Sequence, residues 1–248
     1  MRARLAAYAG TQLRDFLAGR ALLLVVVTSV AAWGYASVTG LDRSAFDASG
    51  GVQARDQLRR LFESLLLVFA FAGGPLAAQG LLARDRRRGY DRLLFARPMS
   101  PARYYAQAFV AAGLGLLLVG GIAVELFAVA VHPVSVVGAV AYMALAWLTI
   151  GGLGFALSAI TRYHAFILVL LVGGDLLLNR YVTGSPDTDR LREAAQYLLP
   201  PAHVIVALRE PFARGGPVEL AALVWPIGFG VLCLGAGLFV LRRRPFGS

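Results

Sequence analysis

Residues 104–131 read YYAQAFVAAGLGLLLVGGIAVELFAVAV, a run in which Glu125 is the only charged side chain. A helix needs about 20 apolar residues, at about 1.5 Å each, to cross roughly 30 Å of hydrocarbon. The run is therefore longer than one membrane crossing requires. It predicts a helix that tilts in the bilayer or extends beyond it.

The rest of the chain has the same character. It has 248 residues, of which 58% are hydrophobic and 15% charged, and its mean hydropathy is +0.67. These values are too apolar for an ordinary soluble domain, so we expect an all-α integral membrane protein with a single membrane domain over residues 1–248. Six transmembrane helices are predicted, at residues 21–39, 61–83, 104–131, 134–160, 163–178 and 218–241.

The distribution of arginine predicts the orientation of these spans. Six spans place both termini on the same side of the membrane, and cytoplasmic loops carry an excess of basic residues. With cytoplasmic termini, the inner segments hold fifteen arginines and three acidic residues, whereas the outer segments hold nine of each. We therefore expect both termini in the cytoplasm.

Two segments outside the spans have helical patterns. Residues 2–20 form an amphipathic helix that would lie at the membrane interface, and a frayed basic tail is the alternative. The longest connection, residues 179–217, is external. In it Asp189 can cap a helix through Leu199, Pro200-Pro201 ends that helix, and a second amphipathic segment covers 202–208. This predicts a short helical element before the sixth span, either an external cap or a re-entrant segment.

Several kinds of chemistry are disfavoured. All 24 basic residues are arginine, so no lysine is present for a phosphate-binding loop or a Schiff base. Cys233 is the single cysteine, and His132, His164 and His203 are scattered along the chain. We expect no metal site, no cofactor and no enzyme activity in this chain, so that any ATP hydrolysis belongs to another subunit.

A basic stretch, RDRRRGYDRLLFARPMSPARYY at residues 84–105, separates the second and third spans and contains seven arginines. Topology and attraction to anionic lipid, about 1 kcal/mol per arginine, account for the charge but not for the order of residues. A stretch pinned between two spans is too short to form a groove-reading module, so nucleic-acid binding is not expected.

The order of residues predicts a short helix on the cytoplasmic membrane surface. Tyr90, Leu93 and Leu94 form one apolar stripe, whereas Phe95 would project away from the membrane. Pro98 ends the helix. After it, Ser100-Pro101 has the chemistry of an N-cap and a first helical residue, so the third helix is expected to start there. Such a surface helix suits docking to a soluble partner.

This framework resembles the cytoplasmic loop of type-2 ABC exporter permeases. The matching positions are Gly89, Leu93, Leu94, Ala96, Arg97, Pro98 and Ser100. The predicted spans, the N-terminal helix, the external element and the terminal LRRRPF also agree with that family. Two positions depart from its pattern: Arg87 replaces the second of two acids that precede the glycine, and Tyr90 stands where threonine is commoner.

The resemblance implies a permease subunit of an ABC transporter, in the inner (cytoplasmic) membrane of a bacterial cell, that exports or moves a substrate. Its loop would be a coupling helix docked on an ATP-binding cassette subunit. Two copies of that subunit would carry ATP and Mg, and a second permease copy or a paralogue would complete the path. The implied docking residues are Asp85, Arg86, Arg87, Arg88, Gly89, Tyr90, Asp91, Arg92, Leu93, Leu94, Phe95 and Arg97.

Two other functions stay open. One is a membrane scaffold that does not transport and instead transmits ATPase work to an extracytoplasmic partner, in protein maturation or motility. The other is a secondary transporter that uses Glu125 or Asp175 for ion coupling.

Glu125 and Asp175 are acidic residues inside predicted spans, each in the outer half. Charged residues at membrane depth are expensive and often functional. They are candidates for an outer gate or substrate path, with Arg180 or His203 as a partner. The alternative is contact with interfacial water or a helix-capping role.

Small residues at Ala70, Gly74 and Ala78 recur every four positions of the second span, with Pro75 as a kink site. This stripe, like the glycines at 151, 152 and 154, predicts either close packing within the monomer or a moving gate or dimer seam.

Overall fold

The computed structural model describes residue 14 and residues 51–73, 75, 100–130, 134–181 and 199–243. Several predicted features lie outside these residues: the first span, the surface helix within 84–97, the helix from Asp189 up to residue 198, and the small residues Gly74 and Ala78. Of the N-terminal segment, Arg14 is described; it is helical and exposed.

The described residues form helices joined by short connections, and none of them is in a β-strand. Three helices are long and apolar enough to cross a membrane: Pro101–Ala128, Val136–Ile160 and Leu220–Arg243. They coincide with the third, fourth and sixth predicted spans. A shorter apolar helix, His164–Asn179, coincides with the fifth. The described residues are thus all-helical as predicted, and these segments have the length and apolar composition that a membrane crossing requires.

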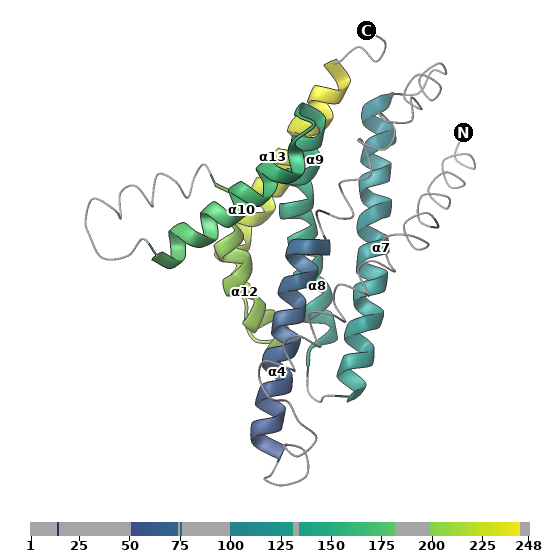
Figure 1. Ribbon diagram of the computed structural model, residues 1–248. Helices are drawn as coiled ribbons and strands as arrows, with labels where there is room; N and C mark the ends of the chain where they lie inside the picture. Colours follow the sequence, from purple (N-terminus) through teal and green to yellow (C-terminus); the bar gives the residue numbers. More distant parts are fainter. Residues whose placement is uncertain are drawn as a thin grey trace.

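The helices run back and forth along one bundle axis (Figure 1). Helix α4 (Gly51–Val68) starts at the lower end and continues as a π-helical segment, η2 (Phe69–Gly73). Helix α7 (Pro101–Ala130) descends, and α8 (Val136–Ala146), η3 (Trp147–Gly151) and α9 (Gly152–Ile160) return upward. Helix α10 (His164–Tyr181) leaves the bundle obliquely, α12 (Ala202–Arg214) descends beside α8, and α13 (Leu220–Arg243) rises to the upper end.

Short polar residues start two of these helices. The N–H of Tyr104 donates to the carbonyl of Ser100 at 3.1 Å, and Pro101 is the first helical residue, which confirms the predicted start of α7. At α8 the hydroxyl of Ser135 accepts from the N–H of Gly138 at 3.0 Å, an N-cap that the sequence analysis did not single out.

Glycines bring α9 and α13 into backbone contact. A methyl group at Gly152 would lie 2.8 Å from the carbonyl oxygen of Gly230, and one at Gly230 would lie 2.5 Å from that of Leu148. Beside this contact the hydroxyl of Thr149 lies 3.1 Å from the carbonyl oxygen of Pro226 in α13. For Gly152, packing within the monomer is therefore the interpretation that the structure supports.

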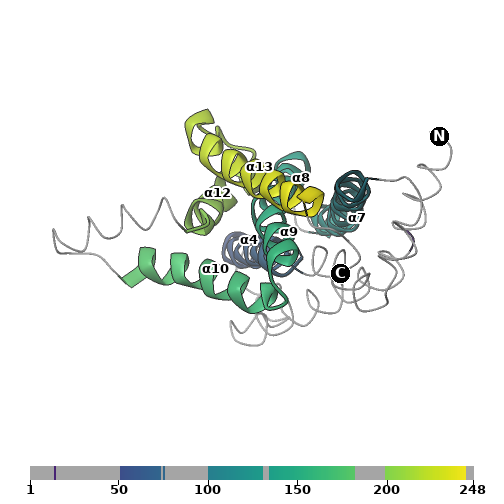
Figure 2. The ribbon, with the colours of Figure 1, turned by 90° about the horizontal axis from the view of Figure 1, so that it is seen from above.

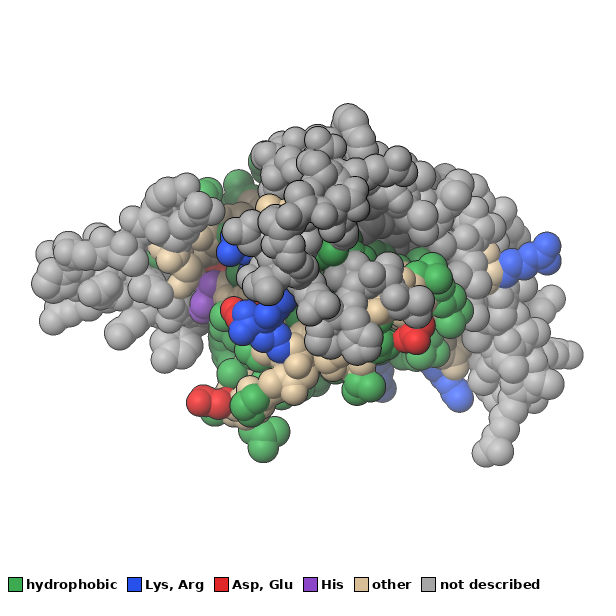
Figure 3. All heavy atoms as spheres, turned by 90° about the horizontal axis from the view of Figure 1, so that it is seen from below, with side chains coloured by type: hydrophobic (Ala, Val, Ile, Leu, Met, Phe, Trp, Pro, Cys, Tyr) green, Lys and Arg blue, Asp and Glu red, His purple; other side chains and the backbone are tan. Residues whose placement is uncertain are grey.

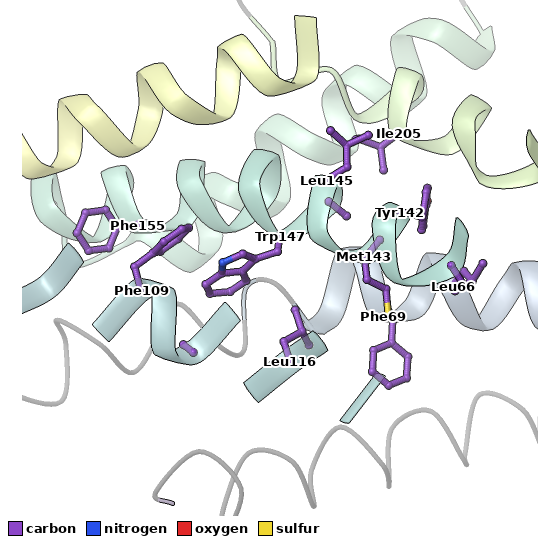
Figure 4. Packing of buried hydrophobic residues seen from close by; sticks show 14 of the residues in the cluster. Leu66, Phe69, Phe109, Leu116, Tyr142, Met143, Leu145, Trp147, Phe155 and Ile205 are labelled. Carbon is purple, nitrogen blue, oxygen red and sulfur yellow. The ribbon is translucent and has the colours of Figure 1, made fainter. Parts of the chain in front are cut away.

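An aromatic group occupies the core between α7 and α9. The rings of Phe109 and Trp147 stack with centroids 4.5 Å apart, and Phe155 meets Phe109 edge-on at 5.7 Å (Figure 4). Gly113 of α7 leaves the room that the Trp147 ring needs, because a Cβ there would overlap the indole. Aromatic pairs in these geometries add about 0.5–1.5 kcal/mol beyond their buried area.

The predicted external element differs in extent. The second amphipathic segment was predicted to end at Leu208, but α12 continues to Arg214. Pro211 lacks an N–H and is nevertheless accommodated within the helix, which ends at Gly215 in the left-handed conformation (φ 65°). Leu199, the predicted last residue of the preceding helix, lies in a bend, and the rest of that predicted helix lies outside the described residues.

Large apolar side chains cover the outside of the bundle. On α7, Val110, Leu114, Leu118, Ile122 and Leu126 recur every four residues and are 50–68% exposed. Exposed faces of α10 and α13 are similarly apolar. Continuous apolar surfaces of this kind are typical of contact with lipid or with another membrane protein.

Candidate functional site

Asp175 of α10 is fully buried, and polar groups of two helices surround its carboxylate. The backbone N–H of His203 donates to Oδ2 at 2.7 Å, and Nδ1 of the same histidine lies 2.9 Å from both carboxylate oxygens. The amide of Asn179 donates to Oδ1 at 3.1 Å. Both oxygens of this buried carboxylate therefore have hydrogen-bond donors.

This arrangement caps α12 from a neighbouring helix. Pro201, at the N-cap position, provides no side-chain hydrogen bond, so the first N–H groups of α12 need another acceptor. Asp175 supplies it for His203, and its negative charge also suits the positive end of the helix dipole. Of the two partners predicted for Asp175, His203 is confirmed, together with the helix-capping role. The side chain of Arg180 lies outside the described part of the chain.

A second polar cluster joins α12 to α4. Glu63 of α4 has a side chain only 10% exposed and lies between two arginines. Nε of Arg59 is 3.5 Å from its Oε1, and Nη2 of Arg209 is 3.3 Å from its Oε2. Glu210 pairs with Arg214 one turn later and lies 4.0 Å from Nη2 of Arg59. One buried carboxylate thus connects the second half of α4 to the middle of α12.

The sequence analysis placed these charges on the same side of the membrane but did not pair them. The spacing of Arg59 and Glu63 is the i, i+4 spacing of a helical ion pair, and this was the signal available. The contact between Glu63 and Arg209 joins residues far apart in the chain. It depends on how α12 packs, which no local pattern reports.

Three donor groups in this region have no hydrogen-bond partner among the described residues: Nη2 of Arg59, Nε of Arg209 and the hydroxyl of Tyr142. Tyr142 of α8 is fully buried between Leu66 of α4 and Ile205 of α12 (Figure 4). Helix α12, which carries Arg209, packs against α8, which carries Tyr142. This polar cluster is therefore incomplete, in contrast to the one around Asp175.

Glu125 does not join either cluster. It is exposed on α7, next to Ile122 and Leu126, which are 55% and 68% exposed. Helices α7 and α10 lie on opposite sides of the bundle in both ribbon views (Figures 1 and 2). The two acidic residues that the sequence analysis grouped therefore occupy separate environments, and the structure does not bring them into one site.

The other predicted site residues are only partly covered. The docking residues between Asp85 and Arg97 lie outside the described residues. Ala70 is buried in η2 and Pro75 is half-buried and helical. Within the described ranges, no three His, Cys, Asp or Glu side chains lie close enough together to hold a metal ion.

The sequence was also compared with known proteins. No protein-family model and no curated protein matches this chain.

Proposed function

We propose that the chain is the transmembrane permease subunit of an ABC transporter. It would couple ATP hydrolysis by a separate ATP-binding subunit to export or other movement of a substrate across the membrane. The observation that carries this proposal is the framework of residues 84–101, which resembles a coupling helix and lies between two helical segments. The start of α7 at Ser100-Pro101 supports the same reading of that framework.

The direction of the helices supports the proposed topology. The start of α4, the end of α7, the start of α8 and the end of α12 lie at the lower end of the bundle (Figure 1). The start of α7 and the ends of α9 and α13 lie at the upper end. In the proposed six-span topology the upper end is cytoplasmic and bears the docking loop. The lower end then faces outward.

The packing of the bundle offers a route for coupling. Helix α7 follows the docking loop directly and packs against α8 and α13. Helix α4 precedes the loop and is tied to α12 through Glu63 and Arg209. Movement of the loop, when two ATP-binding subunits close, would displace both helices and through them the outer end of the bundle. The chain itself performs no covalent chemistry in this scheme, which is alternating access driven by a partner.

Substitutions in the loop test the proposal. Gly89→Val removes backbone freedom at the start of the docking helix, and Phe95→Asp puts a charge on the face expected to contact the partner. Both should abolish ATP-driven transport in reconstituted vesicles and leave the protein folded. Arg103→Gln is the matched control, because Arg103 is exposed at the start of α7, outside the docking framework.

Retention of full ATP-driven transport by both loop variants would show that the docking assignment is wrong. A second measurement is purification in mild detergent, where we expect an ATP-binding subunit with a phosphate-binding loop to accompany the chain. Loss of that subunit from Phe95→Asp, but not from Arg103→Gln, would place its contact on the loop.

A second candidate function is secondary transport, because the buried Asp175 and the partly exposed His203 form an acid–histidine pair between two helices. Such pairs recur in proton relays of membrane transporters. Vesicles that contain the chain alone should then take up substrate when a proton gradient is imposed without ATP. Asp175→Asn should abolish that uptake and Glu125→Gln should not. Absence of ATP-independent uptake in the wild-type chain removes this candidate.

A further inference from the structure

We propose that the junction of α4, α8 and α12 binds a phosphate group through Arg59, Arg209 and Tyr142. These residues come from three different helices, so the site exists only when α12 is packed in place. The proposal concerns binding alone and does not depend on the ABC permease assignment.

The three side chains offer hydrogen-bond donors that the described protein does not use. Arg59 directs Nε toward Glu63, and its Nη2, which lies 4.0 Å from Oε1 of Glu210, has no hydrogen-bond partner in the described structure. Arg209 directs Nη2 toward the same carboxylate, and its Nε has no hydrogen-bond partner in the described structure. The hydroxyl of Tyr142 is the third such group, on a side chain with no exposed surface. Arginine N–H groups can only donate, so the group that completes this site has acceptor oxygens.

The charges of the junction favour an anion as that group. Three arginines (Arg59, Arg209 and Arg214) and two glutamates (Glu63 and Glu210) are linked by ion pairs, which leaves one positive charge in excess. Each oxygen of the Glu63 carboxylate already faces a guanidinium group, at 3.5 and 3.3 Å. A monoanionic phosphate would therefore neutralise the junction. It can also accept from several donors at about 2.9 Å, a geometry that arginine matches well.

The cluster around Asp175 shows the difference between a closed and an open polar site in the same protein. Both oxygens of Asp175 have donors from His203 and Asn179, so nothing more is needed there. Asp175 thus acts as a cap. The arginine junction begins about two turns further along α12, and it contains buried donors that have no hydrogen-bond partner among the described residues. Buried donors without acceptors destabilise the protein, and a ligand that accepted from them would remove that penalty.

Two side chains of the junction are partly exposed at the lower face of the molecule, Arg59 at 33% and Arg209 at 27%. Their unpaired donor atoms and the hydroxyl of Tyr142 are buried, so a ligand would reach them only after these side chains shift. On that face, basic and acidic side chains meet close to a histidine and are flanked by apolar surface (Figure 3). A molecule with a phosphate at one end and an apolar part at the other could thus place the phosphate in the junction and its apolar part against the bundle. A free phosphate could enter the same site, so the source of the group is left to experiment.

Binding can be measured on the full chain in an uncharged detergent. Native mass spectrometry and thermal shift would follow titrations with inorganic phosphate, with phosphatidylglycerol and with phosphatidylcholine. Binding of phosphatidylglycerol without inorganic phosphate would identify a lipid headgroup as the source, and binding of both would identify phosphate itself. Phosphatidylcholine, which has no net charge, should bind at least tenfold more weakly than phosphatidylglycerol.

Variants test the residues. Arg209→Gln and Tyr142→Phe should each weaken binding about tenfold or more, the expected loss for one hydrogen bond to a charged group. Tyr142→Phe keeps the ring and hence the packing between α8 and α12, so it remains informative if Arg209→Gln folds poorly. Arg162→Gln is the control, because Arg162 is an exposed arginine beside a tyrosine ring at the end of α9.

Two results would overturn the proposal. One is the failure of both inorganic phosphate and phosphatidylglycerol to bind the wild-type chain, which would mean that water alone occupies the junction. The other is equal binding by the wild type and Tyr142→Phe.

Discussion

His203 meets the carboxylate of Asp175 with two groups at once, its backbone N–H at 2.7 Å and its ring Nδ1 at 2.9 Å. The first contact caps α12, and the second fixes the orientation of the imidazole. A single buried carboxylate on α10 therefore determines where α12 begins.

Replacing that carboxylate should destabilise the protein. Asp175→Ala leaves the N–H of His203 without its acceptor, at a cost of about 1–3 kcal/mol. Asp175→Asn keeps one acceptor oxygen and should lose less. Thermal unfolding in detergent measures both, and Glu125→Gln, at an exposed position, should unfold like the wild type. Equal effects of Asp175→Ala and Glu125→Gln would contradict the assigned role.

The contact between α9 and α13 predicts a contrast among the glycines of one helix. Gly230→Ala would bring a methyl group to 2.5 Å from the carbonyl oxygen of Leu148, whereas Gly228 has nothing within 4 Å of an added Cβ. We expect Gly230→Ala to lower the free energy of unfolding by about 1–3 kcal/mol, because backbone atoms cannot move aside easily. Gly228→Ala should be neutral or slightly stabilising, since alanine favours helix. Chemical unfolding in detergent distinguishes the two, and the reverse order would refute the backbone contact.

The ion pair between Glu63 and Arg209 should appear as a coupling energy between α4 and α12. In a double-mutant cycle with Glu63→Gln and Arg209→Gln, measured in buffer without phosphate, the two changes should be non-additive by about 1 kcal/mol. The partial exposure of the Arg209 side chain, 27%, keeps the value modest. The control cycle combines Glu219→Gln with Arg209→Gln. Glu219 is exposed, so the effects of these two substitutions should be additive. Additivity in the first cycle would show that α4 and α12 are not coupled there.

The aromatic core should be sensitive to truncation. Trp147→Ala removes the ring that stacks on Phe109 and fills the space beside Gly113, and we expect a loss of about 3–5 kcal/mol. Val137→Ala, at a side chain that is 82% exposed, should change stability by less than about 0.5 kcal/mol. Unfolding temperatures in one detergent compare the two. A loss below about 1 kcal/mol for Trp147→Ala would mean that the stack contributes little.

Features encoded locally could be predicted from the sequence. Apolar length predicted spans at 104–131, 134–160 and 218–241, and these overlap the apolar helices found at 101–128, 136–160 and 220–243. The Ser100-Pro101 pair predicted the start of α7, because capping depends on neighbouring residues only. Pro200-Pro201 likewise marked where the helical pattern is interrupted before α12.

Features that depend on packing were predicted in part or not at all. For Asp175 two partners were open, because the sequence does not say which residue of the external segment lies beside α10. The length of α12 was underestimated, because the helix continues through Pro211 to Arg214. The junction of Glu63 with Arg209 was missed altogether, since it needs α4 and α12 to be placed against each other. Glu125 and Asp175 looked equivalent in sequence, and burial separates them.

The π-helical segment η3 determines how the packing surface of α8 is rotated relative to that of α9. Before it, α8 faces α7 and α12; after it, α9 faces α13 and α10. A π-helical turn contains more residues than an α-helical turn, and each residue of an α-helix rotates the chain by about 100°. Deleting one residue within 147–151 and restoring α-helical hydrogen bonds would therefore turn Gly152 away from Gly230 by about that angle. The extra residue in η3 is what allows one membrane-length helix to present each half to a different pair of neighbours.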